Sequence, residues 1–464
     1  MTPLWFFSAL AFVLLLPGSA ASQSEPRRLT LEEAIRVALE NYPQLAAARA
    51  EARAARAGVD LARTAYLPRT DLLWQENRAT RNNVFGLLLP QSVIPPISGP
   101  VLGTSALEQT AWGSAGGMLV QWEPFDFGTR RANVDAARAS ERRASARVEL
   151  TRLEVASAAA EAFLGTLTAE EAVRATRATV DRMQAFARVV QTLAANDLRP
   201  GAEASRAQAE LAVARNQLIS AEASVESGRA TLAEALGLAG ESVAPNPGAL
   251  LELPPAAPSP AAGLEAHPLV EAAAAQLDAA RARERALDRS YFPRFNYQFA
   301  LYGRGSGALL DGRIDPSKGL LPDVPNWATG LQITFPTLDI FAIRARRRAE
   351  SSAAAAEAAR YEAVVQQLRA ANARAATAAH AARRIAANTP EQLSAARDTE
   401  RLARARYDAG LTSVLEVAEA ERLLASAEVE DAVARLNAWR ALLGEVRARG
   451  VLEPYLEVVR RSVK

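Results

Sequence analysis

The chain repeats its own pattern at a spacing of almost half its length. Tyr42-Pro43 matches His267-Pro268 and Tyr66 matches Tyr291 at one spacing, while Asp126 matches Asp339 and Ala207-Gln208 matches Ala420-Glu421 at a second, slightly shorter spacing. A period of this length is longer than the unit of a solenoid protein. The sequence therefore predicts a duplicated half-molecule, and the small difference in spacing falls between the two sets of matches.

The duplication divides the chain into two repeats joined by a connector. We expect a signal peptide at residues 1–20, a first repeat at 21–246, a connector at 247–263 and a second repeat at 264–464. Six prolines between residues 244 and 263 exclude a helix or a central strand there. Residues 4–16 are almost all apolar and precede a Pro-Gly-Ser-Ala segment, as in a secretory signal peptide. A single membrane anchor is the alternative, although about 13 apolar residues fall short of the ~20 that span a bilayer.

The composition argues against an enzyme. The chain has no cysteine and only two histidines, His267 and His380, which are far apart in the sequence. A thiolate nucleophile, a disulfide and a cysteine metal site are excluded, and we interpret the two histidines as surface or helix-start residues. We therefore expect no catalytic residue, no metal site and no cofactor. The 54 basic and 52 acidic side chains leave a net charge of +2, without the basic patch that nucleic acid requires.

Most of the chain after residue 20 is rich in Ala, Arg, Glu and Leu, which favour helix. Pro124 and Pro200 enclose a long segment without proline, and a helix of about 70 residues would be roughly 100 Å long. Globular domains seldom contain such helices, whereas rods and coiled coils do. We expect long helix pairs at residues 128–238 and 340–449, with a shorter helix at the start of each repeat and a C-terminal segment. Pro390 is expected either to kink the second pair or to restart a helix.

Each repeat also contains one predicted β-hairpin, at residues 69–122 and 294–335. In the second hairpin, apolar side chains alternate with small or polar ones, which is the period-two pattern of a strand. We interpret one face as lipid-facing, formed by Phe295, Tyr297, Phe299, Trp327, Leu331, Ile333 and Phe335. No apolar run after residue 20 is long enough for a transmembrane helix, so a chain that enters a membrane must do so as a barrel. Four strands are too few to close a barrel, which requires several chains.

A membrane protein whose barrel is built from several chains is the first class of protein that fits these features. Two other classes remain open. The hairpins can form a small soluble sheet on a structural coiled-coil protein of the periplasm or cell envelope. An aromatic strand face that is compatible with lipid has no use in such a rod. The third class is a periplasmic adaptor, although adaptors combine one helical hairpin with several β-rich domains and this chain has too few strands.

Both long helix pairs must reverse direction at a turn. In the second pair, Gly410 suits the position after a helix end, where φ is positive, and Ser413 with Glu416 suits a capping box. The aligned first turn contains Asp197, which tolerates a left-handed conformation, and Pro200, which suits a helix start.

The segment around the second turn resembles a known family. Residues 407–421 are similar to the helical-tip signature of TolC-like outer-membrane efflux channels. Three other segments resemble the same family: the Tyr-Pro pair at Tyr42, the Tyr-Leu-Pro segment at Tyr66, and the Trp-Glu-Pro-Phe-Asp-Phe-Gly segment at residues 122–128. The resemblance covers essentially the whole chain after the predicted signal peptide.

The resemblance implies a mainly α fold with a small β part, in which long antiparallel coiled-coil helices carry four β-strands per chain. It implies a homotrimer that completes a 12-stranded transmembrane β-barrel and a periplasmic α-helical tunnel. The location would be the bacterial outer membrane, with a large periplasmic part. The partners would be outer-membrane lipid, a periplasmic adaptor protein and an inner-membrane pump of RND or ABC type. The chain would be the passive exit duct of a tripartite efflux or type I secretion system.

The resemblance also implies roles for residues at the tip. The adaptor would dock on the two turns, at Asp197, Leu198, Arg199, Pro200, Gly410, Leu411, Thr412 and Ser413. Acidic side chains would constrict the pore, namely Glu416, Glu419 and Glu203, because rings of carboxylates from three chains favour cations. The alternatives are a capping role for Glu416 and a solvated helix face for Glu419. Two departures concern this region: Asp197 stands where the family often has glycine, and Arg206 is aligned with Glu419.

Overall fold

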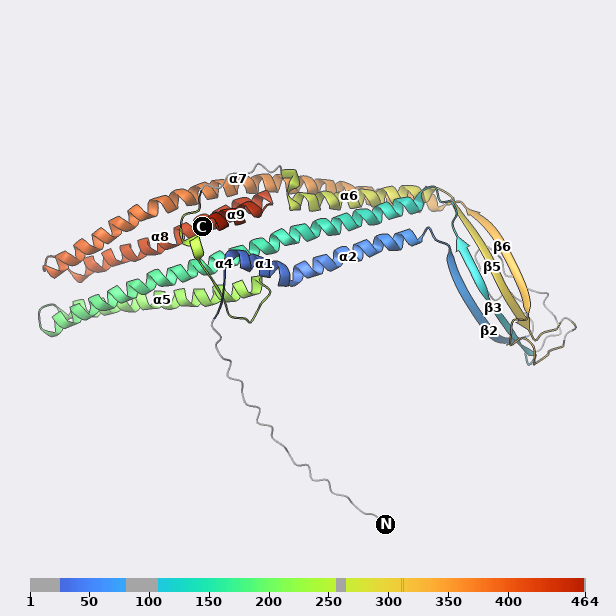
Figure 1. The fold of residues 1–464 in the computed structure, drawn as a ribbon, viewed down its shortest axis with the longest axis horizontal. Helices are drawn as coiled ribbons and strands as arrows, with labels where there is room; N and C mark the ends of the chain where they lie inside the picture. The colour runs from blue at the N-terminus through green and yellow to red at the C-terminus, as the bar shows by residue number, and fades with distance from the viewer. Residues whose placement is uncertain (1–25, 81–106, 256–263, 310, 312, 463–464) are drawn as a thin grey trace, which may run out of the picture.

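The computed structural model describes residues 26–80, 107–255, 264–309, 311 and 313–462. The predicted signal peptide at residues 1–20 and most of the loop within the first hairpin lie outside the described residues. The molecule is long and narrow, with four strands at one end and two helical turns at the other (Figure 1). The predicted fold class, mainly α with a small antiparallel β part, is confirmed.

Two pairs of very long helices form the body of the molecule. α4 (Thr129–Ala195) is followed by α5 (Gly201–Ala235), and α7 (Asp339–Asp408) is followed by α8 (Val414–Arg449), and the members of each pair pack along one another (Figure 1). α4 has 67 residues and α7 has 70, which corresponds to about 100 Å each. Alanines dominate both helices and allow close approach, while the larger apolar side chains supply the packing energy that isolated helices lack.

Shorter helices pack on the middle of α4 and on the parts of α4 and α7 that lie nearer the strands. α1 (Leu31–Asn41) and α2 (Pro43–Thr64) come from the first repeat, and α6 (Pro268–Asp288) comes from the second. α2 and α6 both begin with proline, where the missing N–H costs nothing. His267 is a helix-start residue, as expected: its buried ring accepts a hydrogen bond from the Leu269 N–H at 3.0 Å. His380 is exposed on α7.

The largest hydrophobic core lies where α1, α4, α5, α8 and α9 (Glu453–Ser462) meet. Phe163, Trp439 and Tyr455 are fully buried there, and the rings of Trp439 and Tyr455 meet edge to face at 6.0 Å. The Trp439 indole donates a hydrogen bond of 2.8 Å to the Glu252 carbonyl, just after the short 3₁₀ helix η1 (Gly248–Leu251). Beside this core, β1 (Arg27–Leu29) pairs in parallel with β4 (Val243–Pro245). The connector between the repeats is therefore fastened to the middle of the rod.

Pro390 lies inside α7, which continues without interruption from Asp339 to Asp408. Of the two alternatives expected at this proline, the restart of a helix is therefore excluded. The neighbouring Thr389 is buried, and its hydroxyl donates a hydrogen bond of 2.9 Å to Asp431 on α8. Packing against α8 and this hydrogen bond compensate for the helix hydrogen bond that proline cannot make.

The four remaining strands form one antiparallel sheet in the order β2-β3-β5-β6. Its members are β2 (Arg69–Thr80), β3 (Thr110–Trp122), β5 (Arg294–Ser306) and β6 (Val324–Thr334). The two hairpins join through β3 and β5, so β2 and β6 are open edges within the described chain. Among the described residues, no helix is both long enough and apolar enough to cross a membrane.

Candidate functional site

The two turns at the tip have the same backbone geometry. In each, the residue after the helix end has a positive φ, +57° at Asp197 and +74° at Gly410. The N–H of Leu198 bonds to the Leu193 carbonyl, and that of Leu411 bonds to the Arg406 carbonyl, which closes a Schellman motif in both cases. The expected positive φ at Gly410 is confirmed, and Asp197 occupies the equivalent conformation without being glycine. Pro200 directly precedes the first residue of α5 instead of occupying its first turn.

Arg199 fastens the first turn to the end of α7. Its guanidinium donates a hydrogen bond of 2.8 Å to the Tyr407 carbonyl and lies 4.6 Å from the centre of the Tyr407 ring. The Tyr407 ring is buried against Phe186, and its hydroxyl donates to a Glu203 carboxylate oxygen at 3.3 Å. Burial and the nearby Glu203 carboxylate raise the pKa of Tyr407, so its hydroxyl keeps the proton that it donates. From the sequence, Arg199 and Glu203 were predicted to have separate roles, and no role was predicted for Tyr407.

The three predicted pore carboxylates lie in different surroundings. Glu416 forms an ion pair of 2.9 Å with Arg406 and accepts a hydrogen bond from the Thr412 hydroxyl. Ser413 is the residue before α8, but its side chain makes no capping hydrogen bond, so the expected capping box is wrong. Instead, Arg406 on the other side of the turn donates a hydrogen bond to the Glu416 carboxylate and holds that side chain. Glu419 is exposed and has no ion pair within the described chain, while Glu203 accepts from Tyr407.

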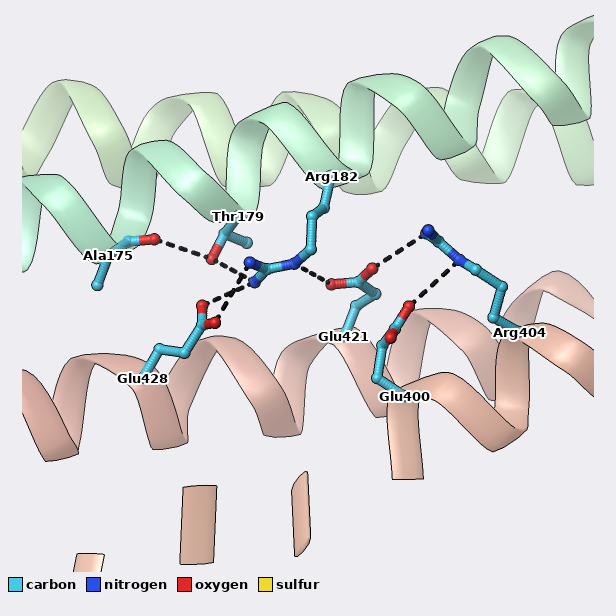
Figure 2. A network of polar contacts seen from close by, with 7 residues as sticks. All are labelled: Ala175, Thr179, Arg182, Glu400, Arg404, Glu421 and Glu428. Carbon is cyan, nitrogen blue, oxygen red and sulfur yellow. Dashed lines mark hydrogen bonds and ion pairs between the residues drawn. The ribbon is translucent and has the colours of Figure 1, made fainter. Parts of the chain in front are cut away.

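An ionic network around the buried Glu421 lies on the strand side of the tip and joins α4 to α7 and α8 (Figure 2). Arg182 on α4 contacts Glu421 at 3.2 Å and Glu428 at 2.8 Å, both on α8. Arg404 on α7 contacts the same Glu421 at 3.2 Å and Glu400 at 3.2 Å. Two guanidinium groups thus face three carboxylates. Burial raises the pKa of Glu421, whose side chain is 1% exposed, against the opposing effect of Arg182.

This network was not predicted from the sequence. The only signal in the sequence was that Glu421 aligns with Gln208 of the first repeat, which is neutral. The charge at this position therefore occurs in the second repeat alone. Among the described residues, no group of three histidine or carboxylate side chains is arranged to hold a metal ion.

The seven residues predicted to face lipid lie on one side of the sheet or continue it. Directly paired residues point to the same face of an antiparallel sheet, and the register pairs Phe295 with Ile333, and Tyr297 with Leu331. Trp327 and Leu331 are 70% and 62% exposed, and Phe335 directly follows β6. The register continues this face to Leu72 and Trp74 on β2, which sequence analysis did not assign. The opposite face carries polar side chains, namely Asp71, Gln75, Asn77, Asn296, Gln298, Gln332 and Arg304.

Steric contact explains why residue 116, on the apolar face, is glycine. A Cβ atom at Gly116 would lie 2.7 Å from the Trp74 ring, which lies against the neighbouring strand. The sequence therefore places glycine opposite tryptophan in the β2–β3 pair, and the aromatic ring covers backbone that glycine leaves open.

Comparisons with known proteins agree with this architecture. The family model described as outer membrane efflux protein matches residues 34–238 and 261–444. No curated protein sequence matches the chain significantly. Among solved structures, the chain is similar to the Campylobacter jejuni CmeC outer membrane channel, at 16% identity and a TM-score of 0.75, with 100% of this chain and 98% of that chain covered.

Two further structures show the same fold. The outer membrane protein VceC of Vibrio cholerae is 18% identical with a TM-score of 0.73, covering 91% of this chain and 96% of that chain. The open state of the Neisseria gonorrhoeae MtrE outer membrane channel is 21% identical with a TM-score of 0.70, covering 91% of this chain and 89% of that chain.

Proposed function

Because the chain belongs to the outer membrane efflux protein family and is an outer-membrane efflux channel, we propose that three copies form the exit duct of a tripartite efflux or type I secretion system. The duct conducts substrate passively from an inner-membrane pump and a periplasmic adaptor to the outside. This family consists of channels rather than enzymes. The structural coiled-coil protein that the sequence left open is not favoured, because the family match covers both repeats.

The observation that carries the proposed assembly is the four-stranded sheet with two open edges and one exposed apolar face. In hydrocarbon every backbone N–H and C=O needs a partner, so an open sheet is unstable there. Pairing of β2 from one copy with β6 from the next removes both edges. Three copies then give a barrel of 12 strands whose apolar face contacts outer-membrane lipid and whose polar face lines the lumen.

The long helices extend this barrel into the periplasm. α4 and α7 are each about 100 Å long, and three copies arranged around one axis enclose a tunnel that ends at the paired turns. The docking site for the adaptor is the exposed edge of these turns, where Leu198 and Leu411 are 68% and 73% exposed. Aligned apolar side chains on equivalent Schellman turns offer the adaptor two similar contact points per chain. The pump is of RND or ABC type.

The acidic side chains above the turns set the selectivity of the constriction. Glu419 is exposed and has no ion pair within the described chain, so three copies contribute a ring of three exposed carboxylates. Glu416 is partly neutralised by Arg406. The contact from Tyr407 to Glu203 and the Arg199 contacts hold the two turns of one chain together and favour a narrow tip.

The experiment that tests the proposal measures location and stoichiometry together. The gene is expressed with its N-terminal segment, the outer-membrane fraction is extracted in detergent, and particle mass is determined by light scattering. We expect a membrane-derived particle containing three chains. A soluble monomer or dimer would contradict the barrel and the exit-duct function.

A further inference from the structure

A charged groove lies between α4 and α6 at the junction of the sheet and the helices. Phe127 and Arg131 line it at the start of α4, and Arg285, Asp288, Arg289 and Phe292 line it at the end of α6 and just beyond. Its volume is about 690 Å³. We call this cavity the junction groove.

The junction groove has an excess of positive charge. Its two carboxylates are already paired with arginines from elsewhere, Asp135 with Arg138 at 3.1 Å and Asp288 with Arg347 at 2.6 Å. Within the described chain, no carboxylate lies at ion-pair distance from the three groove arginines, Arg131, Arg285 and Arg289. Three guanidinium groups therefore line one cavity without a counter-ion of their own.

The neighbouring Arg130, in contrast to the groove arginines, has both a carboxylate partner and an aromatic contact. Its Nε bonds to Asp126 at 3.0 Å, and its guanidinium lies 5.0 Å from the centre of the Tyr66 ring. Asp126 also accepts from the Gly128 N–H, which caps the start of α4. The Asp126 carboxylate thus bonds to Arg130 and to the start of α4. Arg131, at the next position, lines the junction groove instead.

The apolar wall of the junction groove continues onto the lipid-facing side of the sheet. The Phe127 ring stacks on Phe292 at 5.1 Å and lies 6.1 Å from Phe295. Phe295 pairs with Ile333 on the apolar face of β5 and β6. Phe127 holds its ring there with a φ of +50°, a conformation that bulky side chains rarely adopt. Cations and aromatic rings thus meet where the apolar face of the sheet ends.

We propose that the junction groove binds the headgroup of an anionic phospholipid of the periplasmic leaflet, with the phosphate against Arg131, Arg285 and Arg289 and the acyl chains along the aromatic cluster. The proposal rests on the proposed function, because it needs the apolar face of the sheet to stand in the outer membrane. A phosphate bonds well to guanidinium donors, and the adjoining rings favour an amphiphile over a free ion.

The test measures lipid retention by the full-length protein, purified in a neutral detergent, with native mass spectrometry. Phosphatidylglycerol and phosphatidylethanolamine are titrated separately, and glycerol 3-phosphate serves as a soluble headgroup. The groove variant carries Arg131→Gln, Arg285→Gln and Arg289→Gln. The control variant carries Arg142→Gln, Arg215→Gln and Arg374→Gln, which are exposed arginines on α4, α5 and α7 away from the groove.

We expect the wild-type protein and the control variant to prefer phosphatidylglycerol. Each basic residue at an anionic lipid surface contributes a roughly fivefold gain in binding, so the groove variant should lose at least about tenfold. Equal retention of both lipids by the wild type, or an unchanged preference in the groove variant, overturns the proposal. Displacement of phosphatidylglycerol by an equal concentration of glycerol 3-phosphate also overturns it, because the groove would then bind free phosphate.

The same spectra separate this proposal from the proposed function. A three-chain particle from the outer membrane that shows no lipid preference leaves the exit duct intact and removes only the lipid site. Absence of a three-chain particle in the wild type contradicts the duct itself. If the triple variant does not assemble, the single variants Arg131→Gln and Arg289→Gln carry the test, each with a roughly fivefold loss of preference.

Discussion

Arg182 on α4 and Glu421 on α8 form an ion pair of 3.2 Å between side chains from opposite halves of the sequence (Figure 2). Glu421 also accepts from Arg404 on α7, so a single buried carboxylate is held by guanidinium groups from two other helices. Because the two helix pairs come from different repeats, this contact sets how one repeat lies against the other near the tip. Its loss should affect the joining of the pairs more than the helices themselves.

Replacement of Arg182 with Gln should destabilise the protein. Removing one partner of a buried ion pair leaves an uncompensated charge and costs about 3–5 kcal/mol, and we expect the lower end of this range because Arg404 still contacts Glu421. The midpoint of heat-induced loss of assembly in detergent should therefore fall. The control is Arg177→Gln, whose partner Glu222 and whose own side chain are both well exposed, and which should have little effect. Equal midpoints for the two variants would contradict a structural role for the network.

The stability of the protein should depend on pH through Glu421. Burial raises the pKa of Glu421 above its ordinary value of 4.5, with Glu400 adding to the rise and Arg182 and Arg404 opposing it. A carboxyl with a raised pKa binds its proton more tightly in the folded state, so its contribution to stability is full below the ordinary pKa and is lost as pH rises through the raised value. Arg182 also donates hydrogen bonds to Glu428 and to the Thr179 hydroxyl, so these two groups act on Glu421 through Arg182.

Replacement of Glu421 with Gln should remove this dependence. Between about pH 4.5 and pH 7, the wild type should lose thermal stability relative to the variant, because only the wild type has this group to deprotonate. Thermal midpoints of both proteins at several pH values check the difference. Parallel pH profiles would show that folding does not raise the pKa of Glu421.

The sequence was most informative where structure depends on neighbouring residues. The alternation at residues 295–301 predicted the apolar face of β5, and the matching turns predicted positive φ near Asp197 and at Gly410. The predicted capping box of Ser413 and Glu416 is absent because the turn brings Arg406 to Glu416, and the ion pair competes with the capping hydrogen bond. The contact between Arg182 and Glu421 could not be predicted, since it depends on how helices from different repeats pack side by side.

Replacement of Arg199 with Ala should loosen the tip. The change removes both the hydrogen bond to the Tyr407 carbonyl and the contact with the Tyr407 ring, while the Schellman turn itself keeps its backbone bonds. We expect more frequent or longer open events in single-channel recordings in planar bilayers. Arg215→Ala is the control, because this exposed arginine on α5 makes no contact with the turns. Identical gating in both variants would mean that Arg199 does not restrain the tip.

The two carboxylates near the start of α8 should contribute unequally to ion selectivity. Glu419 is exposed without an ion pair within the described chain, whereas Glu416 is paired with Arg406. Glu419→Ala should therefore reduce cation selectivity and block by divalent cations more than Glu416→Ala does. Reversal potentials under a salt gradient, with and without Mg²⁺, measure both effects. A larger effect of Glu416→Ala, or no effect of either change in a conducting channel, would place the constriction elsewhere.

A charge on the apolar face of β6 should block membrane assembly, whereas the same charge at the next position should not. Leu331 is exposed on the face that carries Phe295 and Trp327, and Gln332 points to the opposite, polar face. An arginine facing lipid near the middle of a bilayer costs about 2–4 kcal/mol per chain, and near zero when it faces the lumen. Leu331→Arg should therefore be depleted from the outer-membrane fraction and Gln332→Arg retained there, as measured by fractionation and immunoblotting. Normal insertion of Leu331→Arg would show that this face does not contact lipid.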